Sequence, residues 1–452
     1  MLRLLGVAAG AVLISVHGGQ TRGGTLGGAE RSAPMDVSAL LTAARGAPPM
    51  VCALAAQSIR NGGWGGWGDA PYSPLADQIP PRNYGDTQLP AADVDKLLEA
   101  LASPDGCVRE LAVRLLGGQR DENVANAFVS RLKSADAPMR EVAAFGLGLT
   151  APASAVEPLI RALHDATPNV RANSAWALGR IDDGRALAPL VSVFRDHDVK
   201  VREAAVVSAG HIDSSSTVSA LLRVLQRDDS PEVRRVAAWA LGQRESRDAV
   251  DGLVAALGKE SDARTREMIV WAIGNTDAKA GTPAVAAALR GDADDRVRET
   301  AAWALGEMGD RSAVSALDAA AGAERSSRVR GTAAWALGQL HEDSHKAPAG
   351  LMAVLQDASD DARLKAAWAL GQIGDPNALD AIRAALKTET SSRVRKGLVR
   401  ALIKSGGKSE ATLTQLLSST DPSVREAAVR GLAGSNSFNP WPWPWPRPRP
   451  FP

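Results

Sequence analysis

The sequence has few aromatic residues, almost no cysteine and no excess of either charge. Aromatic residues make up 4% of its 452 residues, and 52 Lys+Arg stand against 51 Asp+Glu, which leaves a formal net charge of +1. Nucleic-acid-binding proteins usually carry a clear basic excess, so this balance argues against such a partner. The two cysteines, Cys52 and Cys107, have a spacing that fits no zinc-binding pattern.

Motifs for catalysis and cofactor binding are also missing. There is no phosphate-binding loop, no dinucleotide fingerprint and no Gly-x-Ser-x-Gly. Residues 341–345 read His-Glu-Asp-Ser-His and match the zinc-protease pattern. They directly follow a predicted helix end, however, and a zinc site needs both histidines on one face of a stable helix. We therefore expect no catalytic residue, no metal and no cofactor.

What the sequence does contain is a repeat. An arginine returns every 30 to 33 residues, within a frame close to Val-Arg-x-x-Ala-Ala-Trp-Ala-Leu-Gly. A fixed period of this length predicts a solenoid whose units bury one face against their neighbours. The repeated arginines are Arg109, Arg140, Arg171, Arg202, Arg234, Arg266, Arg298, Arg330, Arg363, Arg395 and Arg425.

Each repeat predicts two helices. Apolar residues at helical spacing, as in 155–163 and 217–225, mark the first helix. The second helix begins four residues before the arginine, where every repeat has Asp, Ser or Thr, all good N-cap residues. Glycines near its end predict left-handed C-caps. These glycines are Gly179, Gly242, Gly306, Gly338 and Gly371.

The repeats resemble HEAT repeats, in particular the short subtype of the phycobilin lyases. The clearest matches are Gly-Gln-Ile-Gly-Asp-Pro-Asn-Ala at 371–378 and Ser-Ser-Arg-Val-Arg at 391–395. The resemblance implies an all-α, right-handed solenoid of about 11–12 helix pairs, with the second helix of each pair on the concave face. It does not fix a function, because HEAT proteins do unrelated work.

Two enzymatic relatives of this repeat class bear on function. HEAT-like deoxyhypusine hydroxylases carry repeated His-Glu pairs that bind two irons, whereas this chain has only His341-Glu342. No cysteine or histidine forms a chromophore motif of a lyase. A role as an accessory subunit of a lyase or hydroxylase therefore rests on family analogy alone.

The N-terminus and the composition divide the chain into six segments. A short basic start, an apolar stretch over 4–16 and small residues after it predict a signal peptide, with an uncleaved anchor as the alternative. We therefore expect export to the periplasm or the extracellular space. The segments are a signal peptide (1–18), a flexible leader (19–35), a degenerate capping repeat (36–60), a Gly/Trp/Pro-rich inserted loop (61–90), the solenoid (91–434) and a Trp/Pro/Arg-rich tail (435–452).

Structural roles are expected for the arginines and for the cysteines. Arg171, Arg202, Arg234, Arg266, Arg298 and Arg330 are expected to form a ladder with the capping Asp column, each reaching a neighbouring carboxylate or carbonyl. A ligand-binding arginine column is the minor alternative. Cys52 and Cys107 lie near the capping end, where one disulfide would hold the array in an oxidising compartment. Two buried thiols are an equal alternative.

Tryptophan is strongly selected, because it supplies 11 of the aromatic residues against 5 Phe and 2 Tyr. Six tryptophans share the fifth position after the arginine, which falls opposite the expected buried face at 100° per residue. Acids lie one turn before this position and amides one turn after it. The tryptophans are Trp176, Trp239, Trp271, Trp303, Trp335 and Trp368; the acids are Glu141, Glu203, Glu267 and Glu299; the amides are Gln243, Asn275, Gln339 and Gln372.

Two interpretations of the tryptophan column stay open. In the first, each indole lies across small residues of the adjoining repeat and joins the two helices. In the second, the indoles and amides line a groove that binds an extended or Pro-rich peptide, as Trp and Asn arrays do in armadillo-type solenoids.

The C-terminal tail must be extended, because proline occupies every second position from Pro440. It is interpreted as a recognition tail that docks in the groove of its own or a neighbouring chain, with head-to-tail association. The alternatives are weak contact with a membrane interface and a passive end. The sequence thus predicts an exported, non-catalytic protein-interaction scaffold, with an envelope-tethered adaptor as the alternative.

Overall fold

The computed structural model describes residues 36–48, 51–52, 88–119, 121–212, 217–243, 246–276, 278–340, 346–406 and 410–432. These residues form α-helices and short 3-10 turns and contain no strand. The predicted signal peptide, the leader, most of the inserted loop, the motif at 341–345 and the Trp/Pro tail lie outside the described residues. The prediction of an all-α solenoid is confirmed.

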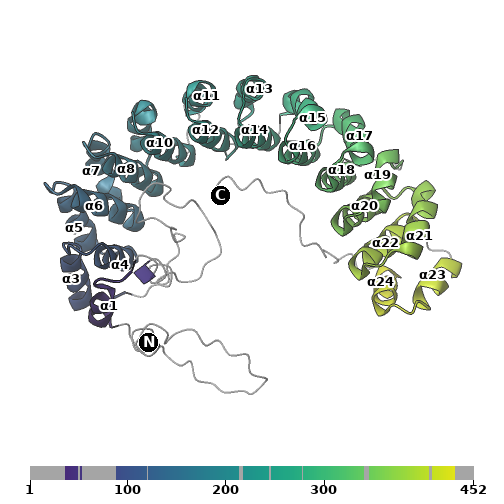
Figure 1. Ribbon diagram of the computed structural model, residues 1–452, viewed down its shortest axis with the longest axis horizontal. Helices are drawn as coiled ribbons and strands as arrows, with labels where there is room; N and C mark the ends of the chain where they lie inside the picture. Colours follow the sequence, from purple (N-terminus) through teal and green to yellow (C-terminus); the bar gives the residue numbers. More distant parts are fainter. Residues whose placement is uncertain are drawn as a thin grey trace, which may run out of the picture.

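The helices stack in pairs along a curved array, with the first helix of each pair on the convex side and the second on the concave side (Figure 1). The first helices are α3 (Ala91–Ala100), α5 (Glu122–Arg131), α7 (Val156–Ala162), α9 (Leu187–Ser192), α11 (Val218–Arg227), α13 (Val250–Leu257), α15 (Thr282–Gly291), α17 (Val314–Ala323), α19 (Ala349–Ala353), α21 (Leu379–Thr388) and α23 (Glu410–Leu417).

The second helices carry the repeated arginines and line the concave face, as predicted (Figure 1). They are α4 (Gly106–Leu116), α6 (Ala137–Thr150), α8 (Pro168–Ile181), α10 (Val199–His211), α12 (Pro231–Gln243), α14 (Ala263–Asn275), α16 (Asp295–Glu307), α18 (Ser327–Gln339), α20 (Asp360–Ile373), α22 (Ser392–Lys404) and α24 (Pro422–Leu432).

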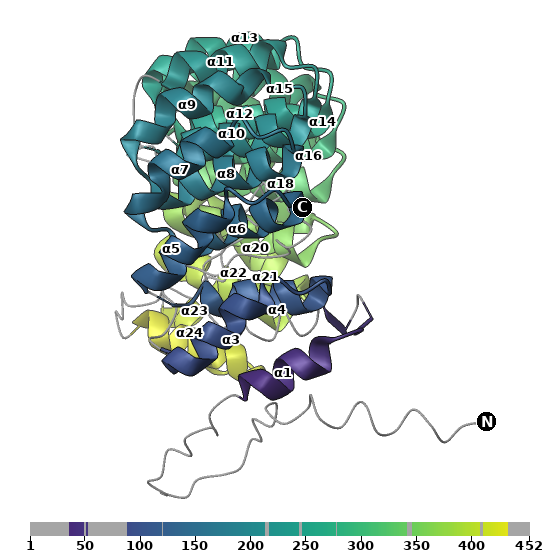
Figure 2. The ribbon, with the colours of Figure 1, turned by 90° about the vertical axis from the view of Figure 1, so that its left-hand side faces the viewer.

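Short 3-10 turns adjoin many of the first helices. They are η1 (Ala153–Ala155), η2 (Gly184–Ala186), η3 (Val193–Arg195), η5 (Arg247–Ala249), η6 (Lys279–Gly281), η7 (Arg311–Ala313), η8 (Val354–Gln356) and η9 (Pro376–Ala378). At the N-terminal end, α1 (Val37–Ala44) packs on α3 and α4, as the side view shows (Figure 2).

The second helices begin at the predicted N-cap residues. Six of these side chains accept a hydrogen bond from a backbone N–H of the first turn, namely Asp105, Asp198, Ser230, Asp262, Asp294 and Ser359. Thr167 and Ser326 have polar side-chain partners in other repeats instead, Arg140 and Asp295. The caps therefore set the helix starts, and some of them also connect repeats.

The predicted glycine C-caps are wrong. Gly179, Gly242, Gly306, Gly338 and Gly371 lie inside their helices, and α20 ends instead at Gly374, with a φ of 66°. Gly242 and Gly338 have a different role. A Cβ at Gly242 would lie 2.6 Å from Cζ3 of Trp271, and one at Gly338 would lie 2.7 Å from Cζ3 of Trp368. A missing side chain lets the next repeat approach closely.

One apolar core runs through all the repeats, between the two helix layers and between successive pairs. The fourth residue after the arginine shows how repeats bury one another. It is fully buried in ten repeats, at Val113, Ala144, Ala175, Val206, Ala238, Val270, Ala302, Ala334, Ala367 and Val399. The equivalent Val429 is 55% exposed, because no described helix follows α24.

Candidate functional site

A ladder of arginine and carboxylate side chains follows the turns that connect the first and second helices. Arg266 is typical. Its Nε and Nη2 donate to Asp292 of the next repeat at 2.7 and 2.9 Å, and its Nη1 donates to the carbonyl of Ser261 at 2.7 Å. The pairs are Arg140–Asp165, Arg171–Asp196, Arg202–Asp228, Arg234–Glu260, Arg266–Asp292, Arg298–Glu324, Arg330–Asp357, Arg363–Glu389 and Arg395–Asp421.

The acidic residues that pair with the repeated arginines were not predicted from the sequence. In all pairs but the last, the acid lies two residues before the N-cap residue rather than at the N-cap itself. Asp292 illustrates its double role: its carboxylate accepts from Arg266 and from the N–H of Asp294, while its carbonyl accepts from Arg298 of its own repeat. The signal was an acid six residues before the arginine in eight successive repeats. Ser134 takes this position opposite Arg109, which has no carboxylate partner among the described residues.

The ladder favours the charged form of most of its carboxylates. Burial acts to raise the pKa of Asp292, but the hydrogen bonds from Arg266 and from the backbone N–H of Asp294 outweigh it, so that the pKa lies below its ordinary value. The hydrogen bond to Asp292 in turn raises the pKa of Arg266. The pKa is likewise lowered, by the same opposing causes, at Asp165, Asp196, Glu260, Glu324 and Asp357.

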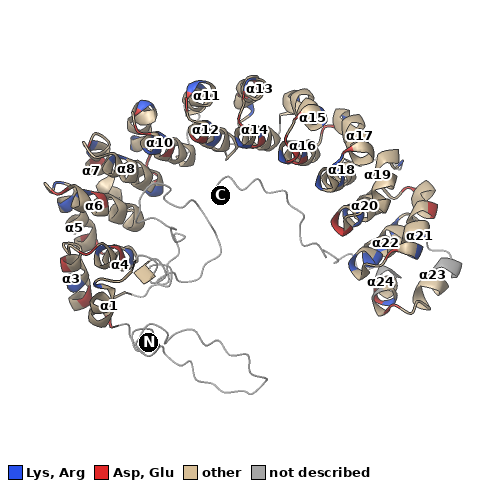
Figure 3. Cartoon of the chain, in the orientation of Figure 1, with Lys and Arg blue, Asp and Glu red and all other residues tan. Residues whose placement is uncertain are grey.

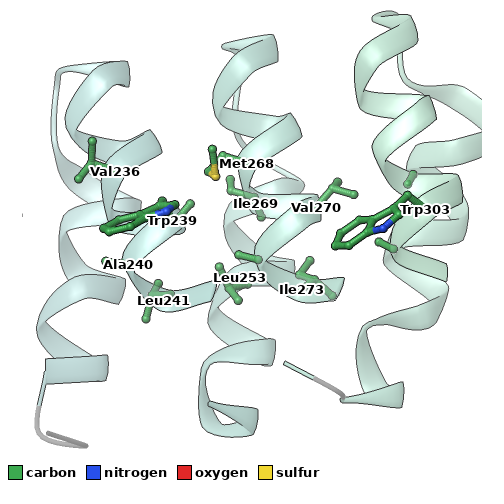
Figure 4. Packing of buried hydrophobic residues seen from close by; sticks show 14 of the residues in the cluster. Val236, Trp239, Ala240, Leu241, Leu253, Met268, Ile269, Val270, Ile273 and Trp303 are labelled. Carbon is green, nitrogen blue, oxygen red and sulfur yellow. The ribbon is translucent and has the colours of Figure 1, made fainter. Parts of the chain in front are cut away.

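The tryptophan column lies mostly between repeats, so that four of the six residues are placed as in the first of the two interpretations. Trp176, Trp239, Trp303 and Trp335 are buried, and Trp303 is only 4% exposed. Its indole extends from α16 toward Val270 and Ile273 of α14 (Figure 4). The helical wheel failed because it considers one helix, whereas the preceding helix approaches closely enough to cover the indole. Trp271 and Trp368 remain partly exposed.

Four positions of the second helices lie toward the concave face, counted −2, +1, +5 and +9 from the arginine, although the +5 side chain is buried in most repeats. On α14 they are Arg264, Glu267, Trp271 and Asn275. Position +9 carries the predicted amides. Among the described residues, the exposed Gln243 and Gln339 have no hydrogen-bond partner, whereas Nδ2 of Asn275 donates to the carbonyl of Trp271 at 3.0 Å. The fourth amide, Gln372, accepts from Lys404 at 3.3 Å.

The acids of the concave face behave differently from those of the ladder. Burial raises the pKa of Glu267 and of Glu299, and nearby arginines only partly offset it. Glu299 lies 3.6 Å from Arg328, whereas Glu267 has no hydrogen bond or ion pair within the described chain. Burial also raises the pKa of Glu141. Glu141 accepts a hydrogen bond from Asn169 at 3.3 Å, so within the described residues Glu267 alone of these three carboxylates has no such partner.

The concave face becomes basic toward the C-terminus. On α22 the same four positions are Arg393, Lys396, Arg400 and Lys404, and Figure 3 shows Lys and Arg along this helix. Lys396 contacts Glu426 of the next repeat at 3.4 Å. The face thus changes in charge along the array, while the ladder does not.

The structure joins Cys52 and Cys107 by a disulfide. The bond lies in a small apolar cluster with Ala44, Val108 and Leu111, which attaches the N-terminal segment to α4. Asp105 adds a hydrogen bond from the N–H of Gly46 at 2.7 Å. Elsewhere in the described ranges, no three His, Cys, Asp or Glu side chains are placed to hold a metal ion. No helix in those ranges is long and apolar enough to span a bilayer.

Stacked helix pairs that contact only their neighbours define the class of α-solenoid proteins. The model of the HEAT repeats matches residues 125–210, 188–274, 250–338, 282–361 and 348–433, and the chain belongs to this family. Comparison with curated protein sequences gives no match.

Solved structures share the fold. Yeast importin-β (Kap95p) is 15% identical, with a TM-score of 0.52 over 75% of this chain and 57% of that chain. Kap121p bound to Ste12p is 17% identical, with a TM-score of 0.50 over 76% of this chain and 46% of that chain. A further structure shows Kap95p with RanGDP, 15% identical, with a TM-score of 0.55 over 75% of this chain and 56% of that chain. This chain thus spans about half the length of these proteins.

Proposed function

We propose that the chain is an exported, non-catalytic scaffold whose concave face binds an extended, Pro-rich segment of a partner protein. HEAT-repeat solenoids commonly serve as scaffolds for protein interaction, and the solved relatives include Kap121p bound to Ste12p. Export is supported by the signal-like start of the sequence and by the disulfide, because disulfides persist in oxidising compartments.

The observation that carries the proposal is the amide row. Gln243 and Gln339 expose amides without a partner in the described chain, and Asn275 and Gln372 continue the row. An amide both donates and accepts, which suits a peptide backbone. Packed helices lie about 8–10 Å apart, and one turn of polyproline II advances about 9 Å. An extended ligand of this form therefore meets this position of one repeat per turn, with amides on α12, α14, α18 and α20 and Glu307 on α16.

The tryptophans contribute less to this surface than the sequence predicted. Trp271 and Trp368 are partly exposed and offer flat apolar surface for proline rings. The other four indoles support the groove from within. The amide row therefore carries backbone recognition, and two tryptophans carry the apolar contacts.

The test uses a fluorescein-labelled peptide with the sequence of residues 438–452 as a Pro-rich probe, and the chain ending at Gly434, which retains all described residues. We expect a saturable rise in anisotropy. Gln243→Ala with Gln339→Ala is expected to weaken binding by about tenfold or more, since amide hydrogen bonds are lost. Gln356→Ala, an exposed amide on η8 of the convex side, is the control.

Two outcomes contradict the proposal. Binding that survives the loss of both amides places the ligand elsewhere. No saturable binding to the protein, together with partitioning of the peptide into phosphatidylglycerol vesicles, favours the envelope-tethered adaptor instead.

A further inference from the structure

A second surface feature lies on the convex side, away from the amide row. A groove of about 390 Å³ separates α9 and η3 from α11. Its floor is formed by Phe194, Ala220 and Val224, all at most 8% exposed, with Val191 on one side. The groove lies where α9 ends at Ser192 and the chain continues as a 3-10 turn.

Three arginines surround this apolar floor. Arg195 comes from η3, and Arg223 and Arg227 come from α11. All three are exposed, and no hydrogen bond or ion pair joins them to another side chain in the described ranges. Figure 3 shows Lys and Arg on the outer side of α11. Three like charges held around an apolar floor repel one another until a ligand neutralises them.

The one acid in the groove is already engaged. Asp228 accepts from Arg202 at 2.8 and 3.0 Å and from the N–H of Ser230 at 2.9 Å, as part of the ladder. It therefore leaves the positive charge of the rim uncompensated. The groove differs in this from the ladder edge, where nine arginines have a carboxylate each.

We propose that this groove binds a short acidic peptide segment in which carboxylates flank one large apolar side chain. The apolar side chain fills the floor, and the carboxylates pair with Arg195, Arg223 and Arg227, whose planar guanidinium groups suit carboxylates. A groove of this size accommodates side chains of a few residues. The site is independent of the concave face and makes the solenoid a scaffold with two different binding surfaces.

The test is fluorescence anisotropy on the full chain with a labelled peptide, Gly-Glu-Glu-Phe-Glu-Glu-Gly. We expect saturable binding that weakens with added salt. Arg223→Glu with Arg227→Glu is expected to weaken it by about tenfold or more. Replacing Phe of the peptide by Ala, or its four Glu by Gln, is expected to do the same. Circular dichroism melting should not change, since both arginines are exposed.

The matched control is Arg161→Glu with Arg290→Glu, the same change of charge on exposed positions of α7 and α15. It should leave binding within about twofold of the unmodified chain, because distant exposed charges are screened.

Equal losses in the two double variants, equal binding of the Gln peptide, or no binding overturns the proposal. So does Arg223- and Arg227-dependent binding of phosphatidylglycerol vesicles without peptide binding. Gln243→Ala with Gln339→Ala should not change binding of the acidic peptide. A failure of the convex-groove proposal can therefore be distinguished from a failure of the proposed concave site.

Discussion

The arginine–carboxylate ladder and the concave face are formed by the same repeats, yet their residue types vary to different extents along the array. From Arg140 onward the ladder uses one arginine and one carboxylate between each repeat and the next. The concave positions change from acid and amide on α14 to four cations on α22. The residue type is constrained at positions that contact the next repeat, whereas it can vary at positions that face solvent. Variation along the array therefore marks the surface available for recognition.

The carboxylates of the two regions differ in the direction of their pKa shifts. On the ladder, arginine and backbone donors lower the pKa of Asp292 against the effect of burial. On the concave face, burial raises the pKa of Glu267, which lacks such a partner. The first group stabilises the fold in its charged form, and the second opposes folding in its charged form.

The largest effect is expected where the tryptophan column joins two repeats. Trp303→Ala should lower the free energy of unfolding by about 3–5 kcal/mol, because a buried indole is lost between α14 and α16. Trp271→Ala should cost less, since Trp271 is partly exposed. Urea unfolding followed by circular dichroism measures both, with Gln339→Ala as the neutral control. Equal costs for the two tryptophans would remove the distinction between packing and exposed indoles.

Breaking one arginine–carboxylate pair of the ladder should lower the free energy of unfolding almost as much. Asp292→Asn is expected to cost about 3 kcal/mol, because Arg266 loses its charged partner in a mostly buried setting. A double-mutant cycle with Arg266→Met should show coupling of these two residues. If the double variant is as unstable as the sum of the single variants, the ladder is not a source of inter-repeat stability.

Within the described residues Arg109 forms no ion pair with a carboxylate of the next repeat, and a disulfide lies nearby. Cys107→Ser should cost about 2–4 kcal/mol in the local stability of this end. Hydrogen exchange should become faster in α1 and α4 and remain unchanged from α12 onward, because repeats contact only their neighbours. Faster exchange throughout the array would contradict this local role.

The smallest effect concerns pH. Ladder carboxylates such as Asp292 and Asp165 have lowered pKa values, so their contribution is present above the unfolded pKa and is lost as the pH falls through the folded pKa. Glu267 has a raised pKa, so its charging reduces stability as the pH rises from its ordinary value through the folded one. Glu267→Gln should therefore raise the melting temperature slightly at pH 7 and leave it unchanged at pH 3. A lower melting temperature at pH 7 would show that the Glu267 carboxylate is stabilised.

Much of this fold follows from the spacing of residues within one repeat. The arginine period, the N-cap residues and the apolar spacing predict the two helices of each pair and their order. Features that depend on two repeats were harder to predict. Asp292 follows Arg266 by 26 positions and meets it only after the chain between them has folded. Trp303 is covered by a helix that a wheel drawn for α16 alone does not include. The convex groove lies between α9, η3 and α11, and its lining residues come from two repeats.

The double role of residues such as Asp292 has a consequence for how this array changes in evolution. Each central repeat carries an arginine that reaches forward and an acid that reaches back, so the contact between two such neighbours is supplied by sequence that both copies already contain. An in-frame duplication of residues 278–309 would therefore add a unit that matches both of its new neighbours. Gene duplication can lengthen such an array first, and later substitutions on the concave positions can then give the new unit a specificity of its own.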